Sequence, residues 1–264
     1  MRAAYLGAMT LRLSVAWVML AFLAPVTPAQ GRGHLDTAQV RQWREDLGVL
    51  RTEMPARHAD LFHAMSRAQF DSALDAIDAK LPGLERHQVI VELERLGAMI
   101  GDGHSSLSPW RDSLVAFHSL PVSLYIFSEG LIIRSADSAH SSLVGSRVLR
   151  IGVMSEDSAM AAVRPLISHD NEMGILAATP FLLAMPEVLH ATGISDTPDS
   201  VVLVMEREGH RHRAVLRSSS LFPMLTGDID RSWRVRDGWT DAREASPTPL
   251  WLAGPLALLE SAPR

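Results

Sequence analysis

The stretch Gly101-Asp102-Gly103-His104-Ser105-Ser106-Leu107 divides the chain into a helical part and a strand-rich part. Before it, Val89, Leu93 and Leu96 recur at the three- and four-residue spacing of an amphipathic helix. A glycine-rich turn between a helix and a strand lets the backbone come close to other groups. Histidine is the side chain best suited to proton transfer near neutral pH. His104 is therefore the candidate active-site residue.

Composition sets the class of protein and excludes several functions. The chain has 264 residues, of which 47% are hydrophobic and 21% charged, which is ordinary for a globular protein with one large or two small domains. A net charge of −5 without any long basic block does not favour a nucleic-acid partner. The absence of cysteine excludes disulfides, thiol catalysis and thiolate metal sites.

Residues 1–29 have the pattern of a secretory signal peptide. Arg2 and Arg12 supply the positive charge, the residues from Leu13 to Leu23 are almost all apolar, and small residues precede a cut after Ala29. An uncleaved anchor is the alternative, but the apolar run is short for a span of ~20 residues. We therefore expect an exported protein, periplasmic or extracellular, with no stable membrane span after cleavage.

The residues from 36 to 100 predict a helical unit of about four helices. Val40, Trp43 and Leu47 mark the first helix, which Asp36 or Thr37 caps and Pro55 ends. The other predicted pieces are a short amphipathic segment over 61–65, a helix over 67–81 capped by Ser66 and closed by Pro82-Gly83, and a helix over 84–100.

After residue 110 the apolar period changes from helical to alternating. The predicted strands are 121–127, 131–134, 147–151, 201–205 and 212–216, the last two joined by a turn at Glu208-Gly209. Ser155 and Asp157 cap a helix, and residues 168–194 read as helical pieces broken at Pro180 and Pro186. The sequence therefore predicts an α+β fold.

Several of these segments together resemble one family. They are the helix end Ile100-Gly101-Asp102-Gly103-His104-Ser105, the strand pair around Leu120-Pro121-Val122 and Gly130-Leu131, and the stretches 143–152, 164–172, 186–194 and 249–252. In order and spacing the chain resembles the tail-specific, or tricorn-core type, serine peptidases, which include the carboxyl-terminal processing proteases.

The resemblance implies a domain plan and roles for particular residues. It implies a helical domain over 30–110, a PDZ-like domain with a helical insertion over 111–220, and a linker with a truncated start of the catalytic core over 221–264. His104 falls at the position of the general base. Leu143, Val144 and Gly145 fall in the peptide groove, where a PDZ-like domain takes a peptide or protein C-terminus by strand addition.

The chain departs from the family at the nucleophile. It contains no Gly-x-Ser-x-Gly elbow and no Ser-x-x-Lys pair. Ser105 and Ser106 are adjacent to His104 in sequence, which rarely gives the geometry of attack. A base without a nucleophile does not make an acyl-transfer enzyme, so we expect the N-terminal part of an exported serine peptidase, inactive alone. The alternative is a non-catalytic exported protein that binds peptides in the PDZ-like groove.

The other polar groups suggest structural roles. Asp102 orients His104 or solvates the turn, and the loop His169-Asp170-Asn171 caps a helix. His58 and His63 are five residues apart and do not share a helical face. His210 and His212 share one face of a strand, as metal ligands sometimes do, but they also lie beside arginines, which is typical of a solvated edge. We therefore expect no metal site and no cofactor.

Overall fold

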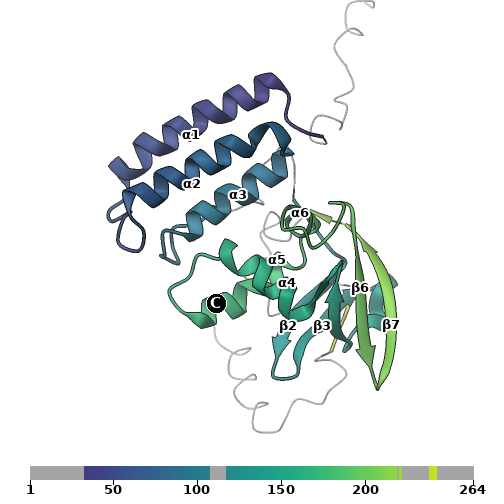
Figure 1. The fold of residues 1–264 in the computed structure, drawn as a ribbon. Helices are drawn as coiled ribbons and strands as arrows, with labels where there is room; N and C mark the ends of the chain where they lie inside the picture. Colours follow the sequence, from purple (N-terminus) through teal and green to yellow (C-terminus); the bar gives the residue numbers. More distant parts are fainter. Residues whose placement is uncertain (1–32, 108–116, 219, 222–237, 243–264) are drawn as a thin grey trace, which may run out of the picture.

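The structure is a computed structural model, and it describes residues 33–107, 117–218, 220–221 and 238–242. Three N-terminal helices precede an antiparallel sheet, so the described residues form the predicted α+β fold. Figure 1 shows α1, α2 and α3 side by side in one layer, with α4, α5 and α6 between this layer and the sheet.

The helical layer consists of α1 (Thr37–Arg57), α2 (Arg67–Lys80), the 3-10 turn η1 (Leu81–Gly83) and α3 (Arg86–Ala98). Asp36 and Gln39 form a capping box at the start of α1, and Ser66 and Gln69 form another at the start of α2. Both caps are where the sequence predicts them.

The main sheet has strand order β2-β3-β4-β6-β7 and is antiparallel throughout. Its strands are β2 (Val122–Phe127), β3 (Gly130–Asp137), β4 (Arg147–Ile151), β6 (Ser200–Arg207) and β7 (His210–Arg217). The short β5 (Met154–Ser155) pairs with β4, and β9 (Trp239–Asp241) pairs with β3. Outside this sheet, β1 (His118–Ser119) pairs with β8 (Ser220–Leu221). The sequence analysis did not predict β9.

The connections between the strands carry the remaining helices. They are the 3-10 turn η3 (Ser138–Leu143) between β3 and β4, then α4 (Glu156–Val163), η4 (Arg164–Leu166), α5 (Glu172–Leu182) and α6 (Pro186–Ala191) between β5 and β6. Ser155 accepts a hydrogen bond from the amide of Ser158 and caps α4 as predicted. The Glu208-Gly209 turn joins β6 to β7, also as predicted.

Helix α3 is buried on two sides and belongs to both cores. Val89, Leu93 and Leu96 pack in the core of the helical layer. Ile90 and Val91, on the other side, pack in the larger core between the sheet and its helices. Because one rigid helix contributes to both cores, it fixes where the turn after it lies relative to the sheet.

Three sequence predictions about helices are wrong. Pro55 lies inside the last turn of α1, and Pro180 lies inside α5, so neither residue ends its helix. A proline removes one amide donor, and packing of the rest of α5 outweighs that loss. The segment over 61–65 is a series of turns, in which Leu61 and Met65 are buried although no helix forms. The unit has three α-helices where about four were predicted.

Several other predictions lie outside the described residues. They are the signal peptide over 1–29 and most of the linker and truncated start of the catalytic core over 221–264. In the ranges that the structure describes, no helix combines the length and the apolar character needed to cross a membrane.

Candidate functional site

The turn that carries His104 begins where α3 ends. The amides of Ile100 and Gly101 donate to the carbonyls of Gly97 and Ala98, which tightens the end of the helix. Gly101 has a φ of +76°, and a Cβ on it would lie 2.7 Å from the Cβ of Ala64. Glycine is therefore required here by both backbone conformation and space, and the turn is held close to the loop between α1 and α2.

Two hydrogen bonds within this turn hold the Asp102 carboxylate in place. Its Oδ1 accepts the amide of His104 at 2.9 Å, and its Oδ2 accepts the hydroxyl of Ser105 at 2.8 Å. The His104 amide, and then the Ser105 hydroxyl, hold the pKa of Asp102 below its ordinary value. The side chain is therefore an oriented carboxylate at neutral pH.

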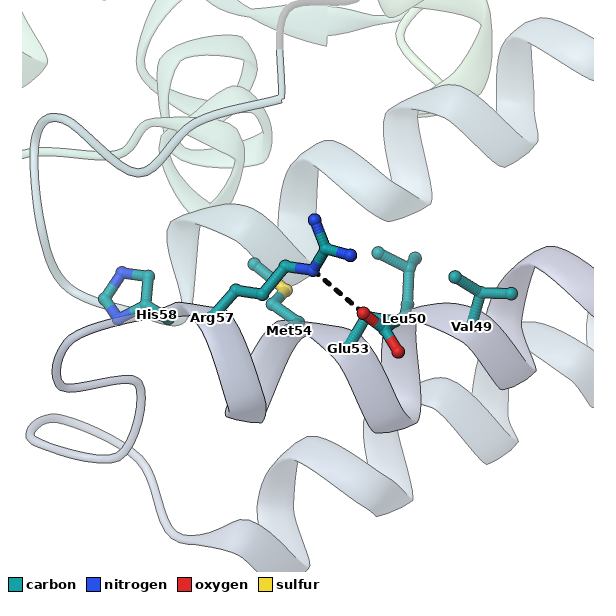
Figure 2. A pocket seen from close by; sticks show the side chains of 6 residues that line it. All are labelled: Val49, Leu50, Glu53, Met54, Arg57 and His58. Atoms are coloured by element: carbon teal, nitrogen blue, oxygen red, sulfur yellow. Dashed lines mark hydrogen bonds and ion pairs between the residues drawn. The ribbon is translucent and has the colours of Figure 1, made fainter.

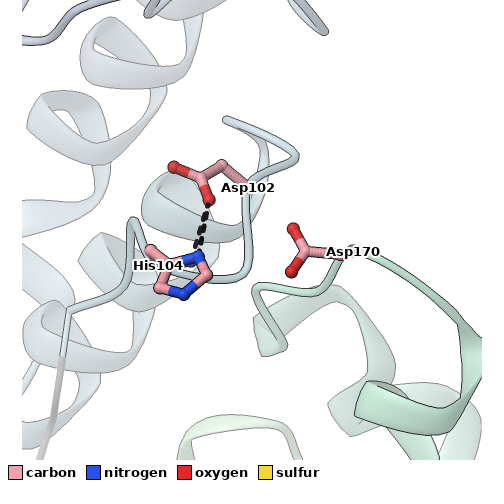
Figure 3. Close-up of side chains that lie close together, drawn as sticks. All are labelled: Asp102, His104 and Asp170. Carbon is pink, nitrogen blue, oxygen red and sulfur yellow. Dashed lines mark hydrogen bonds and ion pairs between the residues drawn. The ribbon is translucent and has the colours of Figure 1, made fainter.

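His104 lies beside this carboxylate and faces solvent (Figure 3). Its Nδ1 is 3.5 Å from Asp102 Oδ1, and 90% of its side chain is exposed. A carboxylate next to one ring nitrogen favours the tautomer with its proton on that nitrogen, which leaves Nε2 as the acceptor. A catalytic imidazole and its orienting carboxylate have the same order of groups, but they are joined by a hydrogen bond; here the two groups are at ion-pair distance.

Asp170 enters the site from the loop between η4 and α5. Its Oδ1 accepts the amide of Gly103 at 2.8 Å, across 67 positions of sequence. A Cβ at position 103 would lie 2.7 Å from Asp170 Oδ2, so glycine gives the carboxylate its room. Nearby, the hydroxyl of Ser168 donates to the carbonyl of Ser105. The predicted capping role belongs to Asn171, which accepts the amide of Gly174, and Asp170 instead holds the turn.

Ser105 is bonded in a way that opposes a nucleophilic role. The amide of Asp60 donates to His58 Nδ1, so the ring proton is on Nε2, which donates to Ser105 Oγ at 2.8 Å. Ser105 Oγ in turn donates to Asp102. Proton donation thus runs from His58 through Ser105 to Asp102, and His58 has no lone pair directed at the hydroxyl. The sequence analysis missed this role of His58, because nothing local links it to Ser105.

His63 makes the second link between this turn and the helical layer. Its Nδ1 lies 2.8 Å from the carbonyl of Asp60 and its Nε2 lies 3.4 Å from the carbonyl of Gly101. Two carbonyls accept two protons, which only the charged ring has. The Asp60 carbonyl, and then the Gly101 carbonyl, accordingly raise the pKa of His63.

Three side chains of the site could together hold a divalent cation. Asp102, His104 and Asp170 each offer one ligand atom, and these atoms lie within 4.8 Å of one another. Carboxylate oxygen with imidazole nitrogen is a donor set used for transition metals. The sequence analysis predicted no metal site and did not bring Asp170 to this turn, because their proximity depends on the tertiary fold. Both carboxylates also accept amides of the turn, so they have a structural role as well.

His210 and His212, the two histidines at the predicted solvated edge, lie on β7 and are not part of this site. His212 Nε2 is 3.3 Å from the hydroxyl of Ser146, and His210 Nδ1 lies 3.0 Å from the carbonyl of Glu208. In the described part of the chain, the two rings are not part of a three-ligand cluster.

The residues predicted to form the peptide groove lie at the end of η3 and in the turn that leads to β4. Leu143 and Val144 are buried in the core of the sheet, and Gly145 is exposed with a φ of +83°. The amides of Val144, Gly145 and Ser146 donate to the carbonyls of Ser141, Ile133 and Leu143. A peptide carboxylate could bind these amides only if those bonds opened, and the prediction of a groove here stays a prediction.

A shallow hollow of about 590 Å³ lies along the second half of α1 (Figure 2). Val49, Leu50 and Met54 form its apolar part, and the ion pair between Glu53 and Arg57 crosses its rim. His58, which also lines it, is the residue that donates to Ser105. The hollow therefore adjoins the site through His58.

No protein-family model matches the chain, and a search of curated proteins returned no match. The likeness to a peptidase family therefore rests on the sequence motifs alone.

Proposed function

We propose that this chain is the part of an exported serine-type peptidase of the tail-specific family that carries the general base. His104 is the base, and Asp102 is its orienting acid. The single observation that supports this most is the exposed His104 imidazole, 3.5 Å from an Asp102 carboxylate that two hydrogen bonds hold in place. Export rests on the signal-peptide pattern of residues 1–29.

The nucleophile in this proposal is not in residues 30–264, which contain no Gly-x-Ser-x-Gly elbow and no Ser-x-x-Lys pair. Of the hydroxyls around the turn, Ser105 donates to Asp102 and Ser168 donates to the Ser105 carbonyl. A serine presented to Nε2 of His104 would complete the set of base, orienting acid and nucleophile. Residues 30–264 alone are then expected to hydrolyse no peptide.

The test is covalent labelling by a serine-directed fluorophosphonate. The probe is applied to native protein immunoprecipitated from the producing cells and to recombinant residues 30–264. The proposal predicts labelling of the native protein, loss of at least 100-fold in labelling rate in His104→Ala, no loss in His210→Ala, and no labelling of the recombinant fragment. Unlabelled native protein, or full labelling of His104→Ala, would contradict it.

A second candidate is a non-catalytic protein that binds peptides in a PDZ-like groove. The resemblance implies a groove at residues 143–145 beside β4, but β4 pairs with both β3 and β6 and has no open edge. The observation that favours this candidate is at a different strand: the outer strand β2 pairs only with β3 in the described sheet and lies next to α5. Tyr125 and Phe127 on β2 are 46% and 43% exposed, and their rings lie 4.7 Å apart. Peptide binding to residues 30–264 that Tyr125→Thr weakens, with unlabelled native protein, would favour this candidate.

A further inference from the structure

Strand β7 forms the other margin of the described sheet (Figure 1). It carries several arginines. Its residues alternate: Leu216 faces the core, whereas Arg211, Arg213, Val215 and Arg217 are exposed on the opposite face. Three arginines therefore stand at alternate positions around one apolar side chain.

The backbone of these same four residues faces the open side of the sheet. Glu208 and Gly209, the two residues of the β6–β7 turn, have φ values of 53° and 78°, as in a type I′ turn. The residues that flank such a turn, Arg207 and His210, form a hydrogen-bonded pair. From there the pattern alternates, so the N–H and C=O groups of Arg211, Arg213, Val215 and Arg217 point away from β6.

The charges on this face are largely unneutralised. Arg211 has a Glu206 oxygen at 3.6 Å, and the Arg211 side chain is 75% exposed. Arg213 lies opposite Val204 and Arg217 lies opposite Ser200. Neither arginine forms an ion pair with any residue that the structure describes. In a chain with a net charge of −5, this strand thus carries three arginines on one face, two of them without an ion pair among the described residues.

We propose that β7 binds an acidic, extended peptide segment by strand addition, with its acidic side chains facing Arg211, Arg213 and Arg217. The open N–H and C=O groups supply the backbone bonds. Opposite charges on facing positions favour the pairing, and Val215 accepts an apolar side chain. Two copies of β7 would instead bring arginines together on one face, which disfavours self-association through this edge. This inference does not depend on His104.

The test uses two fluorescein-labelled peptides with acetyl and amide ends. Their sequences are Glu-Thr-Glu-Thr-Val-Thr-Glu and its reverse, for the parallel and antiparallel directions. Binding to residues 30–264 is measured by fluorescence anisotropy at 50 and 500 mM NaCl. The proposal predicts saturable binding of one peptide that weakens with salt. It also predicts no binding of that peptide with Lys in place of Glu, or with its amides methylated.

Variants of the protein distinguish the contribution of the arginine charges to peptide binding from that of the backbone hydrogen bonds. Arg213→Gln should weaken binding about two- to fivefold, whereas Arg41→Gln, on the exposed side of α1, should not change it. Val215→Pro removes an outward amide that β6 does not use, so it should abolish binding without unfolding the sheet. Tyr125→Thr, on the opposite margin, should bind normally. Val215→Thr keeps the outward amide and loses only the apolar contact, so it should weaken binding far less than Val215→Pro.

Three results would overturn the proposal. They are no binding of either acidic peptide to the wild type, equal binding of the methylated peptide, and equal binding of the Lys peptide. Methylation changes only the peptide, so this arm stays decisive even if Val215→Pro fails to fold.

Discussion

The pKa values of ionisable groups are shifted in opposite directions on helix α3 and at the turn that follows it: toward the neutral forms on the helix and toward the charged forms at the turn. On α3, burial lowers the pKa of His87 and raises the pKa of Glu94 to about 8, so both side chains are driven toward their neutral forms. At the turn, hydrogen bonds from the His104 amide and the Ser105 hydroxyl lower the pKa of Asp102. The carbonyls of Asp60 and Gly101 raise the pKa of His63, which contacts the turn from the loop between α1 and α2, so the charged form of each group is favoured. Desolvation dominates in the helix, and hydrogen bonding dominates in the turn.

The difference indicates where chemistry can occur. His87 is 2% exposed and its Nε2 is bonded to His190 Nδ1 on α6 at 2.8 Å, so it joins the helical layer to the sheet side. The side chain of His104 is 90% exposed and does not link the two layers in this way, so its ring is accessible from solvent. Changing a group on α3 should alter stability, and changing His104 should alter activity.

We expect the largest effect on stability from replacing Glu94. Its Oε2 has no hydrogen-bond partner among the described residues, and the residue is only 6% exposed. Below pH 4.5 the carboxyl is protonated in both states. Between pH 4.5 and 8 the unfolded chain releases this proton while the folded protein keeps it, so stability falls as pH rises. Glu94→Gln should remove a loss of the order of 5 kcal/mol across that window.

Urea unfolding at half-unit steps from pH 4.5 to 8.5 measures this. Glu92→Gln is the matched control, since Glu92 lies on the same helix in an ion pair with Lys80 at 3.1 Å, and it should keep the slope of the wild type. The same slope in Glu94→Gln would show that the carboxyl is ionised in the folded protein.

The next effect is on His87. His87→Ala removes the bond to His190 and leaves a cavity, so we expect a loss of about 2 kcal/mol in the free energy of unfolding at pH 7.5. A histidine with a lowered folded pKa contributes stability above its unfolded pKa of 6.5 and loses it as pH falls. The variant should therefore lose less stability than the wild type on acidification below pH 6.5, and a parallel curve would contradict this.

A smaller effect is expected within the turn. Gly103→Ala brings a Cβ to 2.7 Å from Asp170 Oδ2 and displaces the carboxylate from the Gly103 amide, at a cost of about 1 kcal/mol. Gly83→Ala is the control, because no atom lies within 4 Å of a Cβ there. Equal melting curves for the two variants would show that Asp170 does not hold the turn.

The sequence predicted what depends on neighbours along the chain. The capping boxes of Asp36 and Ser66 each involve a partner three residues away, and the glycines around His104 mark a turn by composition alone. Both features could therefore be predicted from the sequence. Pro180 was misread because packing around α5 outweighs one missing amide.

The remaining parts of the site depend on tertiary contacts. His58 reaches Ser105 across 47 positions, and Asp170 reaches Gly103 across 67. No local pattern links either pair, so the sequence suggested only helix capping for Asp170. The buried Glu94 was missed for the same reason, since the pattern of α3 shows one apolar face and the fold buries two.

Replacing His104, the proposed general base, should have the smallest effect on stability. His104→Ala should change the free energy of unfolding by less than about 0.5 kcal/mol, as for an exposed residue outside the core. The direct measurement is the initial rate of peptide hydrolysis by the native protein, wild type against His104→Ala, beside the unfolding free energies of both. A rate reduced to background with unchanged stability is the predicted result; an unchanged rate, or a loss of rate that follows a loss of stability, would contradict the role of His104 as the base.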